Sequence, residues 1–206
     1  MPIFTDWDER YRQGDTGWDM GEVSPPLAAY FSQLPDKTIS ILVPGCGNSY
    51  EAAWLLDNGF SSLTLIDLAA VLMARLREKF RKYPDPPLRL VTGDFFALEG
   101  QYDLIVEQTF FCALDPVLRP AYVEKMAALL RPGGRLAGLL FDRAFPIGRP
   151  DLAVGEAPGP PFGGNKEEYV SLLEKKFRIR TLEPCYNSIK PRAGTELFLI
   201  AERLPC

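Results

Sequence analysis

A short glycine turn and three acidic residues are the parts of this 206-residue chain whose types and spacing suggest binding chemistry. Gly45 and Gly47 follow an apolar run, and glycine lets a ligand approach the main chain closely. Asp67 comes about 20 residues later, where folds that bind nucleotide-like cofactors place an acid for the ribose hydroxyls. Asp94 and Glu107 end two later apolar runs. The pattern predicts a site for a nucleotide-like cofactor.

Each of these acids also has a plain structural explanation. Asp67, taken alone, is better explained as a helix cap. Asp94 and Phe95 suit the edge and face of an adenine, or else form a strand-end turn followed by core phenylalanines. Glu107 is a candidate for cofactor contact or for a general base, and otherwise is a solvated or salt-bridged carboxylate. The surrounding elements therefore carry much of the argument.

Short apolar runs alternate with helical patterns along the chain. Strands are expected at 39–43, 62–66, 88–92, 102–106, 135–141, 177–181 and 195–202. Helices are expected at 25–34, 48–58, 69–80, 120–131 and 166–176, after a first helix capped by Thr5. Asn48 and Glu51 have the spacing of a capping box. With 47% hydrophobic residues, the chain is expected to form one α/β domain, residues 1–206.

The residue types that are missing exclude several chemistries. The chain has no histidine, which excludes Ser-His-Asp and Cys-His nucleophiles, imidazole bases and histidine-ligated metals. Its four cysteines are widely separated, so neither a disulfide framework nor a zinc site is expected. No metal is predicted.

Charge and hydropathy narrow the partners. A net charge of −4 without a basic cluster disfavours nucleic acid and favours a small-molecule acceptor. No apolar run has transmembrane length and the first residues do not resemble a signal peptide, so we expect a cytoplasmic protein without a membrane partner. Nothing implies an obligate protein partner.

Two segments lie outside the strand and helix alternation. Trp7, Tyr11 and Trp18 precede the first strand, and they either staple the N-terminus to the sheet or cover the cofactor. Residues 143–165 are rich in proline and glycine and follow the fifth strand. A loop of this length above the carboxyl edge of a sheet is predicted to be a lid over the acceptor pocket.

These motifs together resemble class I S-adenosylmethionine-dependent methyltransferases. That motif set has Gly-x-Gly after strand one, an acid after strand two, Gly-Asp-Phe after strand three and Leu-Arg-Pro-Gly-Gly-Arg-Leu before strand five. A nicotinamide dehydrogenase would share only the first two. The chain resembles more narrowly the thiopurine and thiol/halide methyltransferase family, through Val43-Pro44-Gly45-Cys46-Gly47, Gln108-Thr109-Phe110-Phe111-Cys112-Ala113, Gly159-Pro160-Pro161-Phe162 and the spacing of Trp7, Tyr11 and Trp18. Val43 departs from generic class I enzymes, which usually carry an acid there.

The resemblance implies a Rossmann-like methyltransferase fold. Its seven-stranded sheet would be mostly parallel with an antiparallel last strand, with helices on both faces and an N-terminal helical cap, residues 1–37, over the cofactor. The implied cofactor is S-adenosylmethionine, and the product is S-adenosylhomocysteine. The family likeness favours the covering role for the N-terminal aromatics, although Tyr11 stands where tryptophan is frequent. The expected cofactor contacts are Trp7, Tyr11, Trp18, Gly45, Cys46, Gly47, Asp67, Leu68, Asp94, Phe95 and Glu107.

The absence of histidine bears on the acceptor. A sulfonium methyl group is already electrophilic, so the protein must supply position and a dry pocket. Alcohols and phenols generally need a base, whereas sulfide, thiocyanate, halides and low-pKa thiols are largely anionic at neutral pH. The sequence therefore favours direct in-line transfer to a small soft nucleophile, as the family's acceptors do. Glu107, Tyr11 and Tyr186 stay candidates for accepting a proton.

Other functions are compatible with the same motifs. Thiopurine-like thiols and tellurite are possible acceptors within the family, and a small-molecule O-methyltransferase is the nearest alternative outside it. A non-catalytic protein that binds S-adenosylmethionine would carry the same binding residues. Product formation with a panel of acceptors separates these functions.

Overall fold

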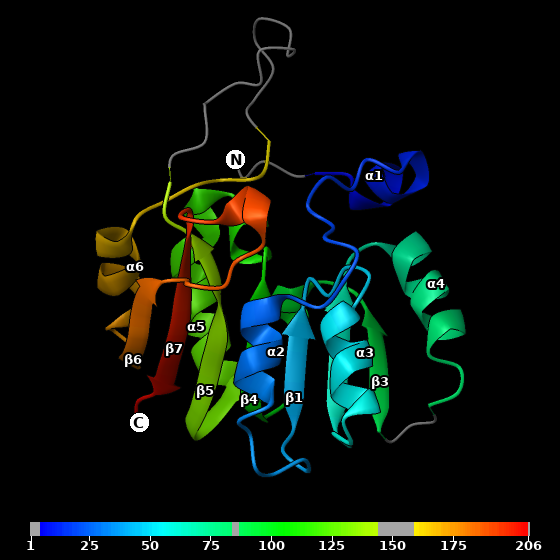
Figure 1. Ribbon diagram of the computed structural model, residues 1–206, viewed down its shortest axis with the longest axis horizontal. Coiled ribbons are helices and arrows are strands. Elements are labelled where there is room, and N and C mark those ends of the chain that lie inside the picture. Colours follow the sequence, from blue (N-terminus) through cyan, green and yellow to red (C-terminus); the bar gives the residue numbers. More distant parts are fainter. Residues whose placement is uncertain (1–4, 84–86, 144–158, 206) are drawn as a thin grey trace, which may run out of the picture.

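A computed structural model describes residues 5–83, 87–143 and 159–205 of the chain. Its centre is a seven-stranded sheet in the order β3-β2-β1-β4-β5-β7-β6, and β7 runs antiparallel to both of its neighbours (Figure 1). The strands are β1 (Ile41–Pro44), β2 (Leu63–Asp67), β3 (Leu88–Thr92), β4 (Tyr102–Gln108), β5 (Leu130–Phe141), β6 (Phe177–Pro184) and β7 (Glu196–Arg203). The predicted mostly parallel sheet with an antiparallel last strand is confirmed.

Helices cover both faces of the sheet because the strands are apolar on both sides. In β1, Ile41 and Val43 pack into one hydrophobic cluster and Leu42 into the other, as the two-residue period of a strand requires. The first cluster lies under α2, α3 and α4, and the second under α5 and α6 (Figure 1). The helices are α1 (Trp7–Gln13), α2 (Pro25–Phe31), α3 (Tyr50–Asp57), α4 (Ala70–Lys79), α5 (Arg119–Leu129) and α6 (Lys166–Leu173).

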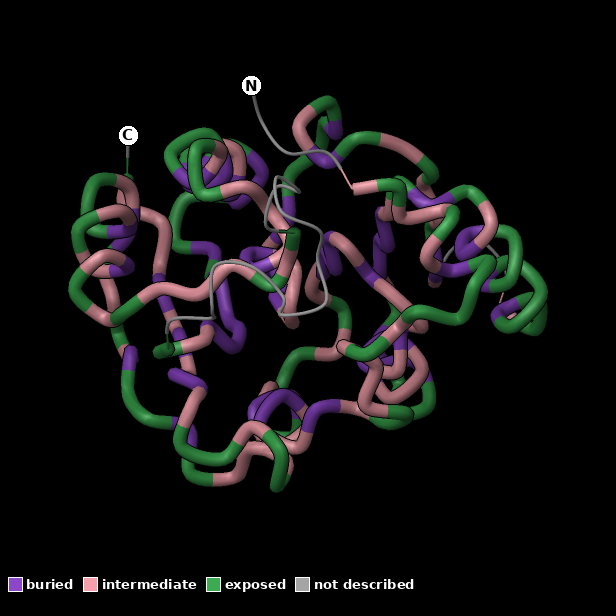
Figure 2. The backbone as a smooth tube through the Cα atoms, turned by 90° about the horizontal axis from the view of Figure 1, so that it is seen from above, coloured by how far each residue is buried: buried purple, intermediate pink, exposed green. Residues whose placement is uncertain are grey.

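Parallel pairing brings the predicted site residues to one edge. Pro44 pairs with Ile66, and Asp67 pairs with Thr92, so β1, β2 and β3 end side by side. Glu107 of β4 stands opposite Gly138 of β5. Figure 2 looks down onto this carboxyl edge, with helices on either side of the strands. The edge therefore collects the tips of strands that lie far apart in the sequence.

Two of the predicted helix starts differ in the structure, the first through a local cap and the second through tertiary contacts. The first helix is capped by Asp6, whose carboxylate accepts from the Glu9 amide at 2.9 Å, and not by Thr5. The helix after the glycine turn has Ser49 in left-handed conformation at its start and no side-chain cap. The predicted capping box is wrong because its two residues bind elsewhere. Asn48 donates to Asp19, and Glu51 accepts from the Ser24 amide at 3.0 Å.

The predicted helices and strands are present in the structure, but several of them end at other residues than predicted. Helices α2, α5 and α6 end at Phe31, Leu129 and Leu173, two to three residues before their expected ends. The expected proline-glycine-glycine turn before the fifth strand lies inside β5, where the pairing with β4 shifts its register. A short 3-10 turn, Pro116–Leu118, precedes α5 and is capped by Asp115. The spacing of Tyr122 and Met126 puts both on one face of this helix, and both are buried.

Residues 144–158, most of the predicted lid, lie outside the described residues. The described end of this segment is tied to the core of the protein. The Phe162 amide donates to the Cys112 carbonyl at 2.7 Å, and Gly164 forms a β-bridge with Arg143. Residues 159–165 therefore pack beside the connection between β4 and α5.

Candidate cofactor and acceptor site

The turn after β1 has the backbone that its glycines predict. Gly45 and Gly47 have φ angles of 55° and 50°, in the left-handed region that side chains disfavour. A Cβ atom built on Gly45 would lie 2.3 Å from Cδ2 of Phe110, so Phe110 occupies the space that a side chain would need. Gly45 therefore makes room for the Phe110 ring, whereas a Cβ atom on Gly47 would have only the Tyr11 hydroxyl near it, at 3.6 Å.

Backbone groups of the turn are less free than the sequence suggests. The Cys46 amide donates to the Ile66 carbonyl at 3.3 Å, and the Gly47 amide donates to Oδ2 of Asp67 at the same distance. The Cys46 thiol points into the core, 3.9 Å from the sulfur of Met73, and burial raises its pKa. Of the predicted contacts in this turn, the Cys46 side chain is therefore directed away from the edge.

Asp67 links the turn to the start of the next helix. Its Oδ1 accepts from the Ala69 amide at 3.0 Å while its Oδ2 accepts from Gly47. The carboxylate is half-buried, and desolvation raises its pKa. Leu68, which follows it, is 56% exposed at the same edge. The cap-like role considered for Asp67 is present, but the same carboxylate also joins two strand tips.

Helix α1 docks on the N-terminal part of α4, beside Asp67. Asp8 accepts from the Val71 amide at 2.9 Å, and Arg75 donates to the Tyr11 carbonyl at 3.3 Å. Tyr11 is 4% exposed, and its hydroxyl lies 3.6 Å from the position of a Cβ on Gly47. Burial and the nearby Asp67 charge raise the pKa of Tyr11. The packing that attaches α1 to α4 is therefore the same packing that places Tyr11 beside the glycine turn.

The three N-terminal aromatic residues form one cluster. Trp18 packs edge-on against Trp7 and Tyr11, with ring centroids 5.4 and 5.7 Å apart. The Arg10 guanidinium lies 4.5 Å from the Trp18 ring centroid. Arg192, from the connection between β6 and β7, donates to the Trp18 carbonyl at 2.7 Å. The cluster is therefore held from its own helix and from the far end of the chain.

Asp94 and Phe95, the pair predicted for the edge and face of an adenine, have different environments in the structure. Asp94 is exposed, and its Oδ1 accepts from the Phe96 amide at 2.8 Å. Phe95 is 4% exposed and packs against Phe96 and Phe110, with centroids 5.3 and 5.1 Å away. The core explanation considered for Phe95 is thus the one the geometry favours, and Phe96 keeps the more accessible ring.

Glu107 is buried at the tip of β4. It is 1% exposed, and its Oε1 accepts from the Phe110 and Phe111 amides at 2.7 and 2.6 Å. Its Oε2 is buried and makes no hydrogen bond among the described residues. Desolvation raises the pKa of Glu107 to about 7, against the effect of the two amide bonds. The solvated carboxylate considered as an alternative is excluded.

The remaining candidates lie apart from this arrangement. Tyr186 follows β6, which runs parallel to β5, so it lies at the carboxyl edge, but its ring is 91% exposed. Cys112 is buried, its thiol donates to the Thr109 carbonyl at 3.3 Å, and burial raises its pKa. The sequence indicated Phe110 only as an apolar residue of the motif at 108–113, without its contact with the glycine turn. No local pattern points to the role of Arg192.

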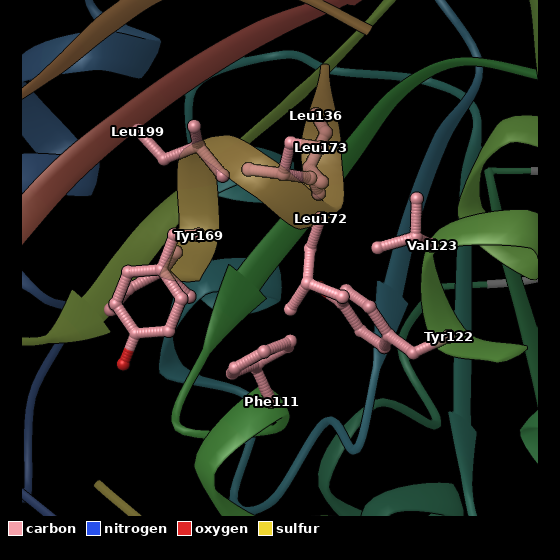
Figure 3. Close-up of a pocket in the computed structure, with 9 residues that line it drawn as sticks. Phe111, Tyr122, Val123, Leu136, Tyr169, Leu172, Leu173 and Leu199 are labelled. Atoms are coloured by element: carbon pink, nitrogen blue, oxygen red, sulfur yellow. The ribbon is translucent and has the colours of Figure 1, made fainter. Parts of the chain in front are cut away.

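An apolar cavity of about 10 Å³ lies elsewhere, between α5, α6 and the sheet (Figure 3). Its walls include Phe111, Tyr122, Tyr169 and Leu199, and almost none of its lining is polar. It holds room for about one water molecule but offers too few polar partners for one. We regard it as a packing defect of the second hydrophobic cluster.

The edge as a whole fits the cofactor that the sequence implies. Two positive-φ glycines leave the turn without side chains, a carboxylate stands at the adjoining strand tip, and Tyr11, which packs against Trp18, lies beside Gly47. No group of three histidine, cysteine, aspartate or glutamate side chains in the described ranges has the arrangement of a metal site. Nor does any helix in those ranges have the length and apolarity needed to cross a bilayer.

Comparison with known sequences places the chain in a family. The profile of the thiopurine S-methyltransferase family matches residues 4–204. A probable thiol methyltransferase 2 of Arabidopsis thaliana is 31% identical over 194 residues, covering 92% of this chain and 81% of the relative. A thiopurine S-methyltransferase of Nitrosospira multiformis is 30% identical, covering 85% and 83%. The match spans nearly the whole chain.

Solved structures show the same fold at lower identity. The 1,6-didemethyltoxoflavin-N1-methyltransferase of Burkholderia thailandensis, solved with S-adenosylhomocysteine, superposes with a TM-score of 0.75 at 22% identity, covering 97% of this chain and 86% of that chain. The glycopeptide N-methyltransferase MtfA superposes with a TM-score of 0.69 at 16% identity, covering 91% and 96%. The predicted methyltransferase fold is confirmed. The chain belongs to the thiopurine S-methyltransferase family and is an S-adenosylmethionine-dependent methyltransferase.

Proposed function

We propose that this enzyme transfers the methyl group directly to a small soft nucleophile, namely sulfide, a thiol, thiocyanate or a halide, without a histidine base. The observation that carries the proposal is that the chain contains no histidine. Relatives named probable thiol methyltransferase 2 and thiocyanate methyltransferase 1, both from Arabidopsis thaliana, support this acceptor class. The second is 26% identical and matches 92% of this chain and 81% of its own length.

The glycine turn and Asp67 are the proposed centre of cofactor binding. Asp67 would accept hydrogen bonds from ribose hydroxyls, because its carboxylate is half-buried at the β2 tip and next to Gly47. Leu68 and Asp94, at neighbouring strand tips, are proposed to border the adenosine portion. Gly45 and Gly47 would let the cofactor approach the main chain.

The aromatic cluster of Trp7, Tyr11 and Trp18 is proposed to cover the site. The rest of the cap predicted at residues 1–37 differs, because α2 packs against the face of the sheet (Figure 1). Bound S-adenosylmethionine supplies a methyl group on a sulfonium cation. Aromatic faces attract such a cation by roughly 0.5–2 kcal/mol for each contact. Trp18 has the best support for this role, since Arg192 and its two ring neighbours fix its position.

Two of the three candidate bases, Tyr11 and Tyr186, support a mechanism without proton abstraction. Burial raises the pKa of Tyr11, so at neutral pH its hydroxyl keeps its proton and is a poor base. Tyr186 is 91% exposed to solvent, where water competes with its hydroxyl for a proton from the methyl acceptor. A soft anion needs no base, so the protein has to orient it in line with the methyl group and exclude water.

Residues 159–165 are proposed to border the acceptor. They lie beside Cys112, through the 2.7 Å hydrogen bond from the Phe162 amide, and they are the described end of the lid predicted at residues 143–165. Arg119 supports them from below, donating to the Gly163 carbonyl at 2.7 Å and pairing with Glu168. The acceptor side would then be separate from the glycine turn.

An acceptor panel tests the function. The enzyme is incubated with methyl-labelled S-adenosylmethionine and sulfide, thiocyanate, iodide, thiophenol, a thiopurine or catechol. We expect labelled product from the soft anions and none from catechol. Product from catechol alone would overturn the soft-nucleophile mechanism, and cofactor binding without product from any acceptor would favour a non-catalytic binder. Activity restricted to the thiopurine would move the acceptor to the aromatic thiols named for the bacterial relatives.

A further inference from the structure

The Glu107 side chain is buried more deeply than a residue that only contacts a ligand needs to be. It points from β4 toward α5, beside the main chain of β5. A Cβ atom on Gly138 would lie 2.6 Å from Cβ of Glu107, so only glycine at 138 leaves room for it. The side chain is 1% exposed. Such complete burial of a carboxylate costs free energy unless the group makes strong hydrogen bonds.

One oxygen of Glu107 makes those bonds to the following turn. Oε1 accepts from the amides of Phe110 and Phe111, at 2.7 and 2.6 Å. Between them and the strand lies Thr109, whose φ of 59° is unfavourable for a β-branched residue. The chain therefore reverses sharply after Gln108, and the carboxylate holds the reversal in place.

This reversal sets the position of the Phe110 ring. Phe110 lies over Gly45 in the glycine turn, where a Cβ would come within 2.3 Å of the ring. Its other neighbours are Phe95 and Tyr122, with centroids 5.1 and 6.1 Å away. Phe110 is thus a wall shared by the cofactor turn and the second hydrophobic cluster.

The same turn also reaches the acceptor side. The Cys112 thiol donates to the Thr109 carbonyl at 3.3 Å, and the Cys112 carbonyl accepts from the Phe162 amide at 2.7 Å. A shift of the turn would therefore move the Phe110 wall and the 159–165 segment together.

We propose that Glu107 is a positioning residue, which holds Phe110 against the glycine turn through its two amide hydrogen bonds and so sets the affinity for the cofactor. It acts as a hydrogen-bond acceptor for the main chain, and neither contacts the cofactor amine nor removes a proton from the acceptor. The inference rests on the proposed placement of the cofactor at Gly45 and Gly47.

The side-chain amide of glutamine distinguishes this role from a charged contact or a base. In Glu107→Gln the amide oxygen can still accept from both backbone N–H groups, whereas the negative charge and the basic oxygen are lost. In Glu107→Asp the charge stays, but the side chain is one methylene shorter and cannot reach both amides in the same backbone. Phe110→Leu removes the wall directly.

The test measures the dissociation constant of S-adenosylhomocysteine by calorimetry on the folded protein, which does not depend on the identity of the acceptor. Glu107→Asp and Phe110→Leu should each weaken binding by about tenfold, equivalent to roughly 1.4 kcal/mol, and the double variant should be little worse than either. Glu107→Gln should bind S-adenosylhomocysteine with the affinity of the natural enzyme. Hydrogen exchange should show the Phe110 and Phe111 amides protected in Glu107→Gln and faster in Glu107→Asp.

The outcomes divide clearly. Affinity lost in Glu107→Gln, which keeps the acceptor oxygen but not the charge, would mean that the charge contacts the cofactor, and would overturn the proposal. Normal affinity in both Glu107→Asp and Phe110→Leu would also overturn it. A Glu107→Gln enzyme that binds normally but loses turnover with a thiol, while keeping it with iodide, which is always ionised, would indicate a base instead. If Glu107→Asp does not fold, Phe110→Leu and the exchange data on Glu107→Gln decide. An inactive acceptor panel would leave these binding measurements intact, so the two proposals fail separately.

Discussion

Asp67 accepts a hydrogen bond from the Gly47 amide, with 3.3 Å between Gly47 N and Asp67 Oδ2, and thereby joins the tips of β1 and β2. The two residues are 20 positions apart in the sequence. Because the carboxylate also accepts from Ala69, it fixes the glycine turn relative to the start of α4. A single acid thus shapes the edge and presents the charge that the proposed ribose contact needs.

Replacing Asp67 by alanine should weaken cofactor binding. Hydrogen bonds to a charged group contribute roughly 1.5–3 kcal/mol each, so the dissociation constant for S-adenosylhomocysteine should rise by at least tenfold. Asp36→Ala is the matched control, since Asp36 also accepts from a backbone amide, that of Thr38 at 2.8 Å, but lies before β1 at the opposite edge. Equal affinities in the Asp67→Ala variant and the natural protein would reduce Asp67 to a helix cap.

Trp18→Ala tests the aromatic cover. The substitution removes the ring that Trp7 and Tyr11 contact but leaves the backbone carbonyl that Arg192 binds. We expect weaker binding of S-adenosylmethionine by roughly 0.5–2 kcal/mol, because one aromatic contact with the sulfonium is lost. Trp54→Leu, in the packing between α2 and α3, is the control for loss of a tryptophan elsewhere. Unchanged kinetics with the best acceptor would leave Trp18 with a stapling role only.

Gly45→Ala should damage the site through sterics. An alanine at φ 55° costs roughly 1–2 kcal/mol, and its Cβ would meet the Phe110 ring at 2.3 Å. The variant should lose both stability and cofactor affinity. Gly93→Ala, at the tip of β3, places its Cβ where nothing lies within 4 Å and should be tolerated. Thermal unfolding and calorimetry on the two variants make the comparison, and a well-folded Gly45→Ala enzyme with normal affinity would contradict it.

Glu107 should make stability depend on pH. Burial raises its pKa from 4.5 to about 7, so within this window the folded protein keeps a proton that the unfolded chain releases. The free energy of unfolding should therefore fall as pH rises from 5 to 8, by up to about 3 kcal/mol. Urea unfolding of the natural protein and of Glu107→Gln isolates this group, because every other residue is shared.

The natural protein should lose stability relative to Glu107→Gln over that range. Parallel curves for the two proteins would show that the carboxylate titrates near its ordinary pKa. That result would point to water at Oε2, which makes no hydrogen bond among the described residues.

Local sequence patterns correctly predicted the strands and helices that surround the site. The strand limits at 88–92 match β3 fully. In the helix expected at 69–80, the residues spaced four, three and four apart are all buried, namely Ala69, Met73, Leu76 and Phe80. These features depend on period and on neighbouring residues. The capping box was wrong for the opposite reason, since Asn48 and Glu51 were drawn to Asp19 and Ser24, more than 25 residues away.

The sequence by itself determined the alternating α/β order, the glycine turn and the acids at successive strand tips, because apolar period, turn chemistry and short spacing are local properties of the chain. Only the tertiary structure decided how those groups are used. It buried Phe95, turned Glu107 toward the Phe110 and Phe111 amides, and brought Arg192 to the Trp18 carbonyl across 174 residues. Such pairings depend on which surfaces meet after packing, and each side chain then binds the nearest unsatisfied partner, whatever its distance along the sequence.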